Sequence, residues 1–201
     1  MTITRQDALA LDARDPLAPL RAQFTLPTGV IYLDGNSLGV LPAVAPTRVA
    51  QAVQQEWGEG LIRSWNSANW VTLPQRVGDK IGRVIGAQPG ETLAGESTSV
   101  NLYKVLAAAL LLVRQQSDAA RRVIVSERSN FPTDLYIAEG LARQHGFELK
   151  LVEPDEIAAQ LGPSLAVLML THVNYRTGRM HDMAALTRAA HEAGSLALWD
   201  L

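Results

Sequence analysis

Hydroxyl, aromatic and carboxylate side chains occur at four points of the sequence, each where an apolar strand pattern ends or a helical pattern begins. These points are STS (97–99), RSNFPTD (128–134), VNYRTG (173–178) and Asp200. Ligands of parallel α/β sheets bind beyond the carboxyl ends of the strands. We therefore expect these side chains to face one common rim and to form a binding site there.

The hydroxyl residues Ser97, Thr98 and Ser99 directly precede a long helical pattern. Unpaired backbone N–H groups and the helix dipole favour an anion at such a position, and the three hydroxyls add further donors. An ordinary helix N-cap is the alternative interpretation. The sequence contains neither GxGxxG nor GxxxxGK[ST], so the usual nucleotide-binding loops are missing.

Two residues of the second point suggest a planar ligand. Phe131 stands before a proline on a strand-to-helix turn, where its ring could stack on such a ligand, and a core phenylalanine is the alternative. Asp134 falls in the first turn of the following helix, where the dipole alone would favour a carboxylate.

Asp200 directly follows the apolar run LALW. An acid that is buried there needs a partner, and a protonated ring nitrogen would be one. A solvated loop acid or a helix cap is the alternative. The four histidines stand at no metal-binding spacing, and we interpret them as structural or surface residues, with His172 as the possible exception. There is no cysteine, which excludes disulfides and thiolate metal sites.

The elements that must position these groups alternate between helix and strand in the second half of the chain. We expect helices at about 99–116, 132–146 and 181–194, and strands at 121–127, 147–152, 165–173 and 195–200. The strands are continuous apolar runs, which indicates burial on both faces. The pattern predicts an α/β fold, a three-layer parallel or mixed sheet with crossover helices.

The first half gives weaker patterns. We expect a strand at 30–34, a helix at 42–58 with Pro42 in its first turn, a polar and aromatic loop at 63–70, and a helix at 71–85. Residues 1–29 are expected to form an irregular arm with a short helix, because prolines interrupt them.

Composition narrows the class of protein. The net charge of -2 gives no electrostatic case for nucleic acid. The N-terminus lacks the pattern of a signal peptide, and the most apolar run, 105–113, is too short to span a bilayer. We expect a cytoplasmic protein that binds neither nucleic acid nor a membrane.

Six longer motifs together resemble those of the bacterial kynureninase family, in the same order and with similar gaps. They are YLDGNSLG (32–39), GLIRSWNSANW (60–70), TSVNLYKVL (98–106), SNFPTDLYIAEGL (129–141), LTHVNYRTGRMHDM (170–183) and LALWDL (196–201). The resemblance implies the large domain of a pyridoxal-phosphate (PLP)-dependent transferase of the aspartate aminotransferase type, fold type I. It also implies a homodimer that hydrolyses L-kynurenine, or 3-hydroxykynurenine, to anthranilate, or 3-hydroxyanthranilate, and L-alanine in tryptophan degradation and NAD biosynthesis.

The resemblance also implies a role for each matching residue. Thr98 and Ser99 correspond to phosphate-binding residues, Phe131 to the residue stacked on the pyridine ring, and Asp200 to the acid that pairs with the ring nitrogen. Pro132, Thr133 and Asp134 complete the cofactor loop, Thr171 lies beside the ring, and Ser37 and Trp65 lie near the substrate. Residues 1–45 would form an arm of the small domain, and 46–201 an incomplete PLP-binding large domain.

The family's Schiff-base lysine lies beyond the acid matched by Asp200, and none of Lys80, Lys104 and Lys150 stands in its motif. We therefore expect the chain to be the amino-terminal half of such an enzyme and to be inactive alone. Another class V PLP enzyme, such as a cysteine desulfurase or aminotransferase, is one alternative. A non-catalytic α/β fragment that binds a phosphate ligand is a second, and an inert fragment is a third.

Overall fold

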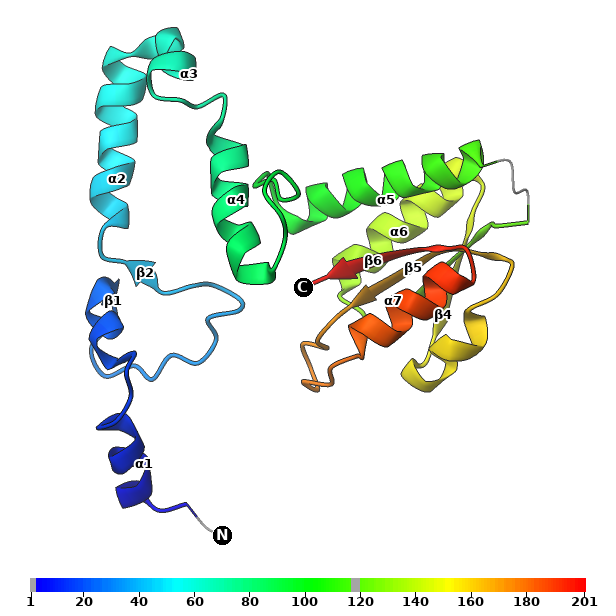
Figure 1. Cartoon of the computed structure of the whole chain (residues 1–201), viewed down its shortest axis with the longest axis horizontal. Helices are drawn as coiled ribbons and strands as arrows, with labels where there is room; N and C mark the ends of the chain where they lie inside the picture. The colour runs from blue at the N-terminus through cyan, green and yellow to red at the C-terminus, as the bar shows by residue number, and fades with distance from the viewer. Residues whose placement is uncertain (1–2, 117–119) are drawn as a thin grey trace. The chain divides into compact units, whose positions relative to one another are not determined.

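A computed structural model describes residues 3–116 and 120–201 of the chain. The chain forms two compact units, one ending at Ala94 and the other beginning at Gly95, and each is described by itself (Figure 1).

The second unit contains a parallel sheet of four strands in the order β4-β3-β5-β6. The strands are β3 (Val123–Glu127), β4 (Glu148–Val152), β5 (Leu165–Thr171) and β6 (Leu196–Asp200). The α/β class and the parallel sheet predicted from the unbroken apolar runs are confirmed.

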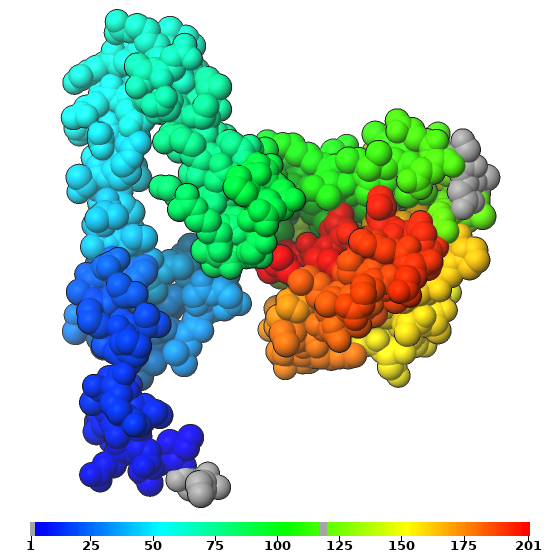
Figure 2. Space-filling model, viewed as in Figure 1, coloured from blue at the N-terminus to red at the C-terminus, as the bar shows by residue number. Residues whose placement is uncertain are grey.

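Helices cover both faces of this sheet and complete three layers (Figure 1). The helices α5 (Thr98–Gln115) and α6 (Pro132–His145) pack with Ile124, Val167 and Met169 on one face. On the other face, α7 (Met183–Glu192) and the 3₁₀ helix η4 (Pro154–Gln160) pack with the intervening strand residues. In the space-filling view the atoms of α7, orange to red, lie over this face (Figure 2). The alternation of side chains along each strand thus divides the core into two apolar layers.

The ends of α6 follow its sequence signals. Pro132 occupies the first turn, where its missing N–H costs nothing, and Gly146 ends the helix with a left-handed φ of 71°. These ends fix where the preceding turn, 128–131, leaves the sheet and enters the helix.

The first unit consists of short helices and one small ladder. Its elements are α1 (Arg5–Asp12), η1 (Ala18–Gln23), β1 (Phe24–Thr25), β2 (Leu41–Pro42), α2 (Ala45–Gln51), η2 (Ala52–Glu59), η3 (Leu61–Arg63), α3 (Ser64–Ser67) and α4 (Leu73–Ile85). Here β1 pairs antiparallel with β2. Among residues 3–94, the buried positions are Ser64, Gly78 and Gly82.

Three predictions for this unit are wrong. Residues 30–34 form no strand but an exposed loop, in which the Tyr32 hydroxyl lies within hydrogen-bond distance of the carbonyls of Asp34, at 2.9 Å, and Leu38, at 2.6 Å. The helix expected over 42–58 begins at Ala45, because Pro42 belongs to the β2 ladder and Pro46 takes the first turn.

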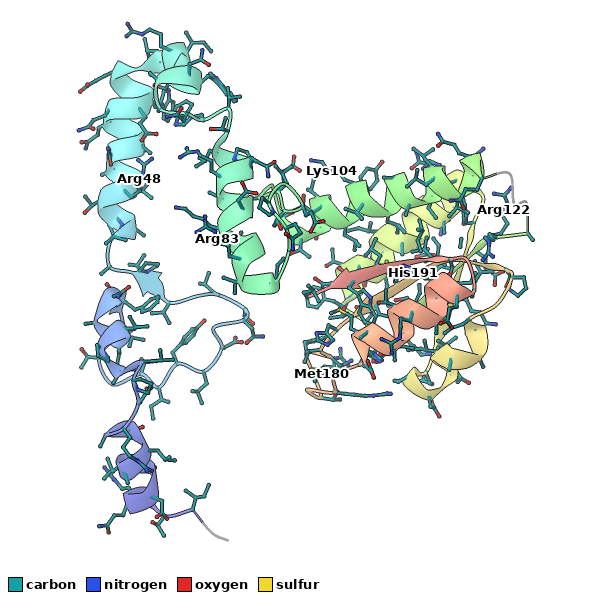
Figure 3. The ribbon with its side chains drawn as sticks, viewed as in Figure 1. Arg48, Arg83, Lys104, Arg122, Met180 and His191 are labelled. Carbon is teal, nitrogen blue, oxygen red and sulfur yellow. The ribbon has the colours of Figure 1, made fainter. Side chains whose placement is uncertain are left out.

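The predicted loop 63–70 instead contains α3 and follows a π-helix, η2. Arg48, which projects from α2, pairs with Glu56 at 2.6 Å, and the Trp70 indole N–H donates to the same carboxylate at 2.7 Å (Figure 3). These two donors hold the pKa of Glu56 below its usual value. Leu61 and Asn69, which lie between Glu56 and Trp70 in the sequence, have positive φ angles of 52° and 57°, so the backbone of this segment is locally strained.

Candidate functional site

The carboxyl edge of the sheet collects the polar residues predicted to form a site. Thr171 is paired in register with Asp200 on the neighbouring strand, and both strands end there. Glu127 ends β3 at the same edge, and the turn to α6 follows it. Because all four strands are parallel, every strand contributes its last residue to this rim.

The start of α5 borders a cavity of about 250 Å³ that also reaches the end of β6. Its lining is Thr98, Asn101, Leu102, Val105, Leu198, Trp199 and Asp200. Ser97 caps the helix, since its hydroxyl accepts a hydrogen bond from the Val100 N–H at 3.4 Å. Thr98 is exposed at the cavity, and Ser99 is the next, half-buried residue. The N-cap reading is therefore correct for Ser97, and Thr98 is the residue of the helix start that lines the cavity.

Two carboxylates belong to this edge: Asp200, which lines the cavity, and Asp134, whose pKa responds to the charge of Asp200. Asp134 is buried with 3% exposure, and its Oδ2 atom has no hydrogen-bond partner. Burial, and then the charge of Asp200, raise the pKa of Asp134 to about 6. A fully exposed acid favoured by the helix dipole would have the opposite shift, so the dipole alone does not describe this residue.

Asp200 is half-buried as the last residue of β6, so it is neither a loop acid nor a helix cap. Burial raises its pKa, while the Thr171 hydroxyl and the Leu201 backbone N–H lower it by hydrogen bonding. The Thr171 hydroxyl also lies in hydrogen-bond contact with Asn130 Oδ1. It has one proton, so it donates either to Asn130 or to Asp200 at any moment.

The turn before α6 presents an aromatic ring. Phe131 is 45% exposed, which excludes the alternative of a core phenylalanine. Its ring meets the Tyr175 ring edge to face, with centroids 5.3 Å apart, and its backbone N–H donates to Asn130 Oδ1 at 2.6 Å. Pro132 begins α6, and Thr133 is half-buried beside it. The predicted cofactor loop is thus held by the hydrogen bond of the Phe131 N–H at one end and by the first turn of α6 at the other.

The two residues predicted near a substrate lie in the first unit. Ser37 is exposed and donates to Asp34 Oδ1 at 2.8 Å. Trp65 is 50% exposed on α3, and its ring meets the Trp70 ring edge to face at 6.2 Å. Their role in substrate binding stays a prediction.

The three lysines lie in the two helices and the strand that the sequence predicts for their positions. Lys80 is on α4, Lys104 on α5 and Lys150 on β4, and all three are exposed. Lys104 forms an ion pair with Glu96 at the start of α5 (Figure 3). None of them lines the cavity at the start of α5.

Sequence reasoning missed Glu127 and His181, two buried polar residues at this edge, and it included Asn130 and Asn174 only as members of the segments 128–134 and 173–178. His181 is buried against Glu127, with 2.7 Å between Nε2 and Oε2. His172, the histidine set apart in the sequence, is half-buried with its ring edge to face with Trp199. A glutamate that ends an apolar strand was the one available signal for this group.

The part of the chain that the structure describes contains neither a membrane-spanning helix nor a metal-binding cluster. Over 3–116 and 120–201, no helix is both long and apolar enough to cross a bilayer. Within the same part of the chain, no cluster of three histidine or acidic side chains could hold a metal ion.

The fold is that of PLP-dependent enzymes of fold type I. In a C-DES mutant with glycine covalently linked to its PLP cofactor, 49% of the chain matches 90% of this one, with a TM-score of 0.70 and 14% identity. The apo cysteine desulfurase of Thermococcus onnurineus NA1 matches all of this chain over 48% of its own, with a TM-score of 0.64 and 19% identity. At these identities the likeness concerns the fold alone.

Sequence similarity is more specific. The kynureninase of Pseudomonas fluorescens is 58% identical over 201 residues, which cover 98% of this chain and 48% of that protein. The kynureninase of Burkholderia pseudomallei strain 1106a is 57% identical over 203 residues, with the same coverage. The chain is thus a relative of the kynureninases, and it spans about half the length of the curated relatives it matches. No protein-family model matches the chain.

Proposed function

We propose that this chain binds PLP at the carboxyl edge of its sheet and that the whole protein is a kynureninase. The reaction would be hydrolysis of the Cβ–Cγ bond of L-kynurenine, which yields anthranilate and L-alanine. The observation that carries the proposal is the cavity that joins Thr98 at the start of α5 to Asp200 at the end of β6. Burial, and then the charge of Asp200, also raise the pKa of Asp134.

The residues present fit this cofactor. Two carboxylates that are withdrawn from water repel each other, and one oxygen of Asp134 has no partner. A cationic ring nitrogen near Asp200 would offset the repulsion, because opposite charge favours the ionised acids. A phosphate group suits the other end of the cavity, where Thr98 and the unpaired N–H groups of α5 lie.

When bound, PLP supplies an electron sink for negative charge that develops on the substrate. The residues of this chain would hold and tune it. The Asp200 carboxylate would accept a hydrogen bond from the ring N–H and keep that nitrogen protonated, while Thr171 orients the carboxylate. Phe131 would cover one face of the ring, and Thr98 with Ser99 would bind the phosphate. Pro132 and Thr133 fix the loop between these contacts.

Further parts of the proposal rest on similarity to kynureninases. We infer that Ser37 and Trp65 contact the substrate, and that residues 1–45 serve as an arm while 46–201 belong to the PLP-binding domain. All strands of the parallel sheet lie after Gly95, within this second range. We also infer that the whole protein is a cytoplasmic homodimer of tryptophan degradation.

Cofactor binding is tested on the chain itself. Equilibrium dialysis of PLP against the wild type, Asp200→Asn and the exposed control Asp155→Asn should show affinity reduced about tenfold or more in Asp200→Asn alone, the scale of a hydrogen bond between charged groups. Equal affinity in all three would contradict the assigned role of Asp200.

The reaction is tested in a chimaera in which this chain replaces the matching half of the Pseudomonas fluorescens kynureninase. We expect the chimaera to form anthranilate, which is followed by its fluorescence. Asp200→Asn in the chimaera should lower turnover by roughly 10²-fold or more, as for other preorganised electrostatic groups. A folded, PLP-loaded chimaera without activity would refute the proposed reaction.

A further inference from the structure

A buried hydrogen-bond network connects the segment after β3 with the segment after β5. Its residues are Glu127, Ser129, Asn174 and His181, which we name the clamp. Glu127 is 5% exposed, Asn174 7% and His181 7%, and none of these three lines the cavity at the start of α5. A buried polar group is costly unless its hydrogen bonds are made, so these side chains need one another.

The two carboxylate oxygens of Glu127 contact different residues. Its Oε2 accepts from His181 Nε2 at 2.7 Å, and its Oε1 contacts the Ser129 hydroxyl and lies 3.4 Å from Asn174 Nδ2. The Glu127 backbone carbonyl also accepts the N–H of Asn130 at 3.0 Å. One residue at the end of β3 thus fixes both the turn that follows it and a histidine 54 residues away.

Asn174 fixes the second segment in the same way. Its Nδ2 donates to the Ser129 carbonyl at 3.3 Å and hydroxyl at 3.0 Å. Its Oδ1 accepts the backbone N–H groups of Arg176 at 3.0 Å and Thr177 at 3.1 Å. The Nδ2 atom of Asn174 therefore holds the two loops together, while its Oδ1 atom orders the turn that follows Asn174 in its own loop.

The two loops held in this way carry the facing rings of Phe131 and Tyr175. Glu127, Phe131, Thr171, Asn174 and Tyr175 also line one small recess. A change in the clamp would shift one ring relative to the other, because the clamp holds the two loops that carry them. The rings contact each other edge to face, and Tyr175 also contacts the neighbouring Arg176.

We propose that Glu127 and His181 are positioning residues, which hold Phe131 and Tyr175 in the orientation needed at the cofactor ring. The part of this inference that concerns the cofactor rests on the proposed function. The part that concerns loop order stands on the contacts alone. Neither residue lines the cavity at the start of α5. Glu127 acts through Ser129, Asn174 and the turn to α6, and His181 acts through Glu127.

The variants are His181→Leu, which removes the hydrogen bond to Glu127, and His181→Gln, whose amide can replace it. The matched control is His191→Gln, because His191 is exposed on α7 (Figure 3). Amide hydrogen exchange of the chain without PLP should rise about tenfold or more at Asn130, Phe131, Arg176 and Thr177 in His181→Leu, with α5 unchanged. His181→Gln should restore most of the protection.

The second readout is the induced circular dichroism of PLP at saturation, divided by bound PLP. We expect His181→Leu to lower this signal by half or more and His181→Gln to retain it, since a ring held less firmly loses its fixed asymmetric surroundings. If His181→Leu fails to fold, Ser129→Ala gives the same test, because it removes one contact to each of Glu127 and Asn174.

The outcomes separate the two proposals. Unchanged exchange in a folded His181→Leu or Ser129→Ala chain would overturn the positioning role, whether or not PLP binds. Faster exchange with an unchanged PLP signal would overturn its connection to the cofactor. Failure of the wild type to bind PLP would refute the proposed function, while the exchange result would still decide whether the clamp orders the loops.

Discussion

Replacement of Asp134 by asparagine should make the chain without cofactor more stable at neutral pH. The carboxylate is 3% exposed, its Oδ2 has no partner, and its pKa rises from 3.8 to about 6. In the native state the acid therefore holds its proton at pH values where the unfolded chain has released it. By linkage, the free energy of unfolding falls as the pH rises through this window.

The size of the effect follows from the same values. A rise in pKa from 3.8 to about 6 corresponds to about 3 kcal/mol of unfolding free energy, which is lost between about pH 4 and pH 7. Asp134→Asn does not titrate, so its advantage over the wild type should grow from near zero at pH 4 to about 3 kcal/mol at pH 7.5. The charge of Asp200 contributes to the raised pKa of Asp134, after burial.

Urea unfolding followed by far-ultraviolet circular dichroism at pH 4.0, 5.5 and 7.5 measures the difference. Asp155→Asn removes an exposed carboxylate from the same unit and should change the free energy by no more than about 0.5 kcal/mol. The reasoning is refuted if the difference between Asp134→Asn and the wild type does not depend on pH, or if it matches that of Asp155→Asn throughout.

Three further predictions concern the cofactor, the core and catalysis. Thr98→Ala should weaken PLP binding by roughly 1–3 kcal/mol in equilibrium dialysis, because a hydroxyl at the helix start is lost; unchanged affinity would reduce the STS segment to a cap. Leu106→Ala should lower the free energy of unfolding by roughly 2–5 kcal/mol in urea, since this side chain is fully buried; a loss below 1 kcal/mol would contradict the packing of α5 on the sheet. The chain supplied with PLP and L-kynurenine should form no anthranilate above the cofactor-only control, and borohydride reduction should label none of Lys80, Lys104 and Lys150 stoichiometrically; activity with one labelled lysine would show that the catalytic lysine has been misplaced.

The second half of the fold could be predicted because its signals are local and agree with one another. Unbroken apolar strands, Pro132 at the start of α6 and Gly146 at its end each fix one feature without reference to the rest. The strand expected at 30–34 was wrong because β propensity describes a fit to neighbouring strands, and this apolar segment has none. Pro42 misled the helix prediction, since a proline suits an edge ladder as well as a first helical turn.

The candidate site also has a part that could be predicted from the sequence and a part that could not. Asp200, Asp134 and Thr98 stand at strand ends or helix starts, so the rule for parallel sheets was enough to place them on one rim. The clamp was beyond this reasoning, because Glu127 and His181 meet across 54 residues and two loops. The sequence around a single histidine does not indicate its partner, because this contact depends on the path of the chain between the two residues.

The near absence of buried side chains before Ala94 has a consequence for how the chain responds to proteases. Among residues 3–94 no apolar side chain is buried, whereas the second unit has two apolar layers. Opening of the first unit by itself therefore exposes little additional apolar surface and costs little free energy. Brief digestion with trypsin should cleave at arginines of the first unit, such as Arg48 and Arg63, long before those of α6. A protected piece that begins near Gly95 should remain, and mass spectrometry would identify it.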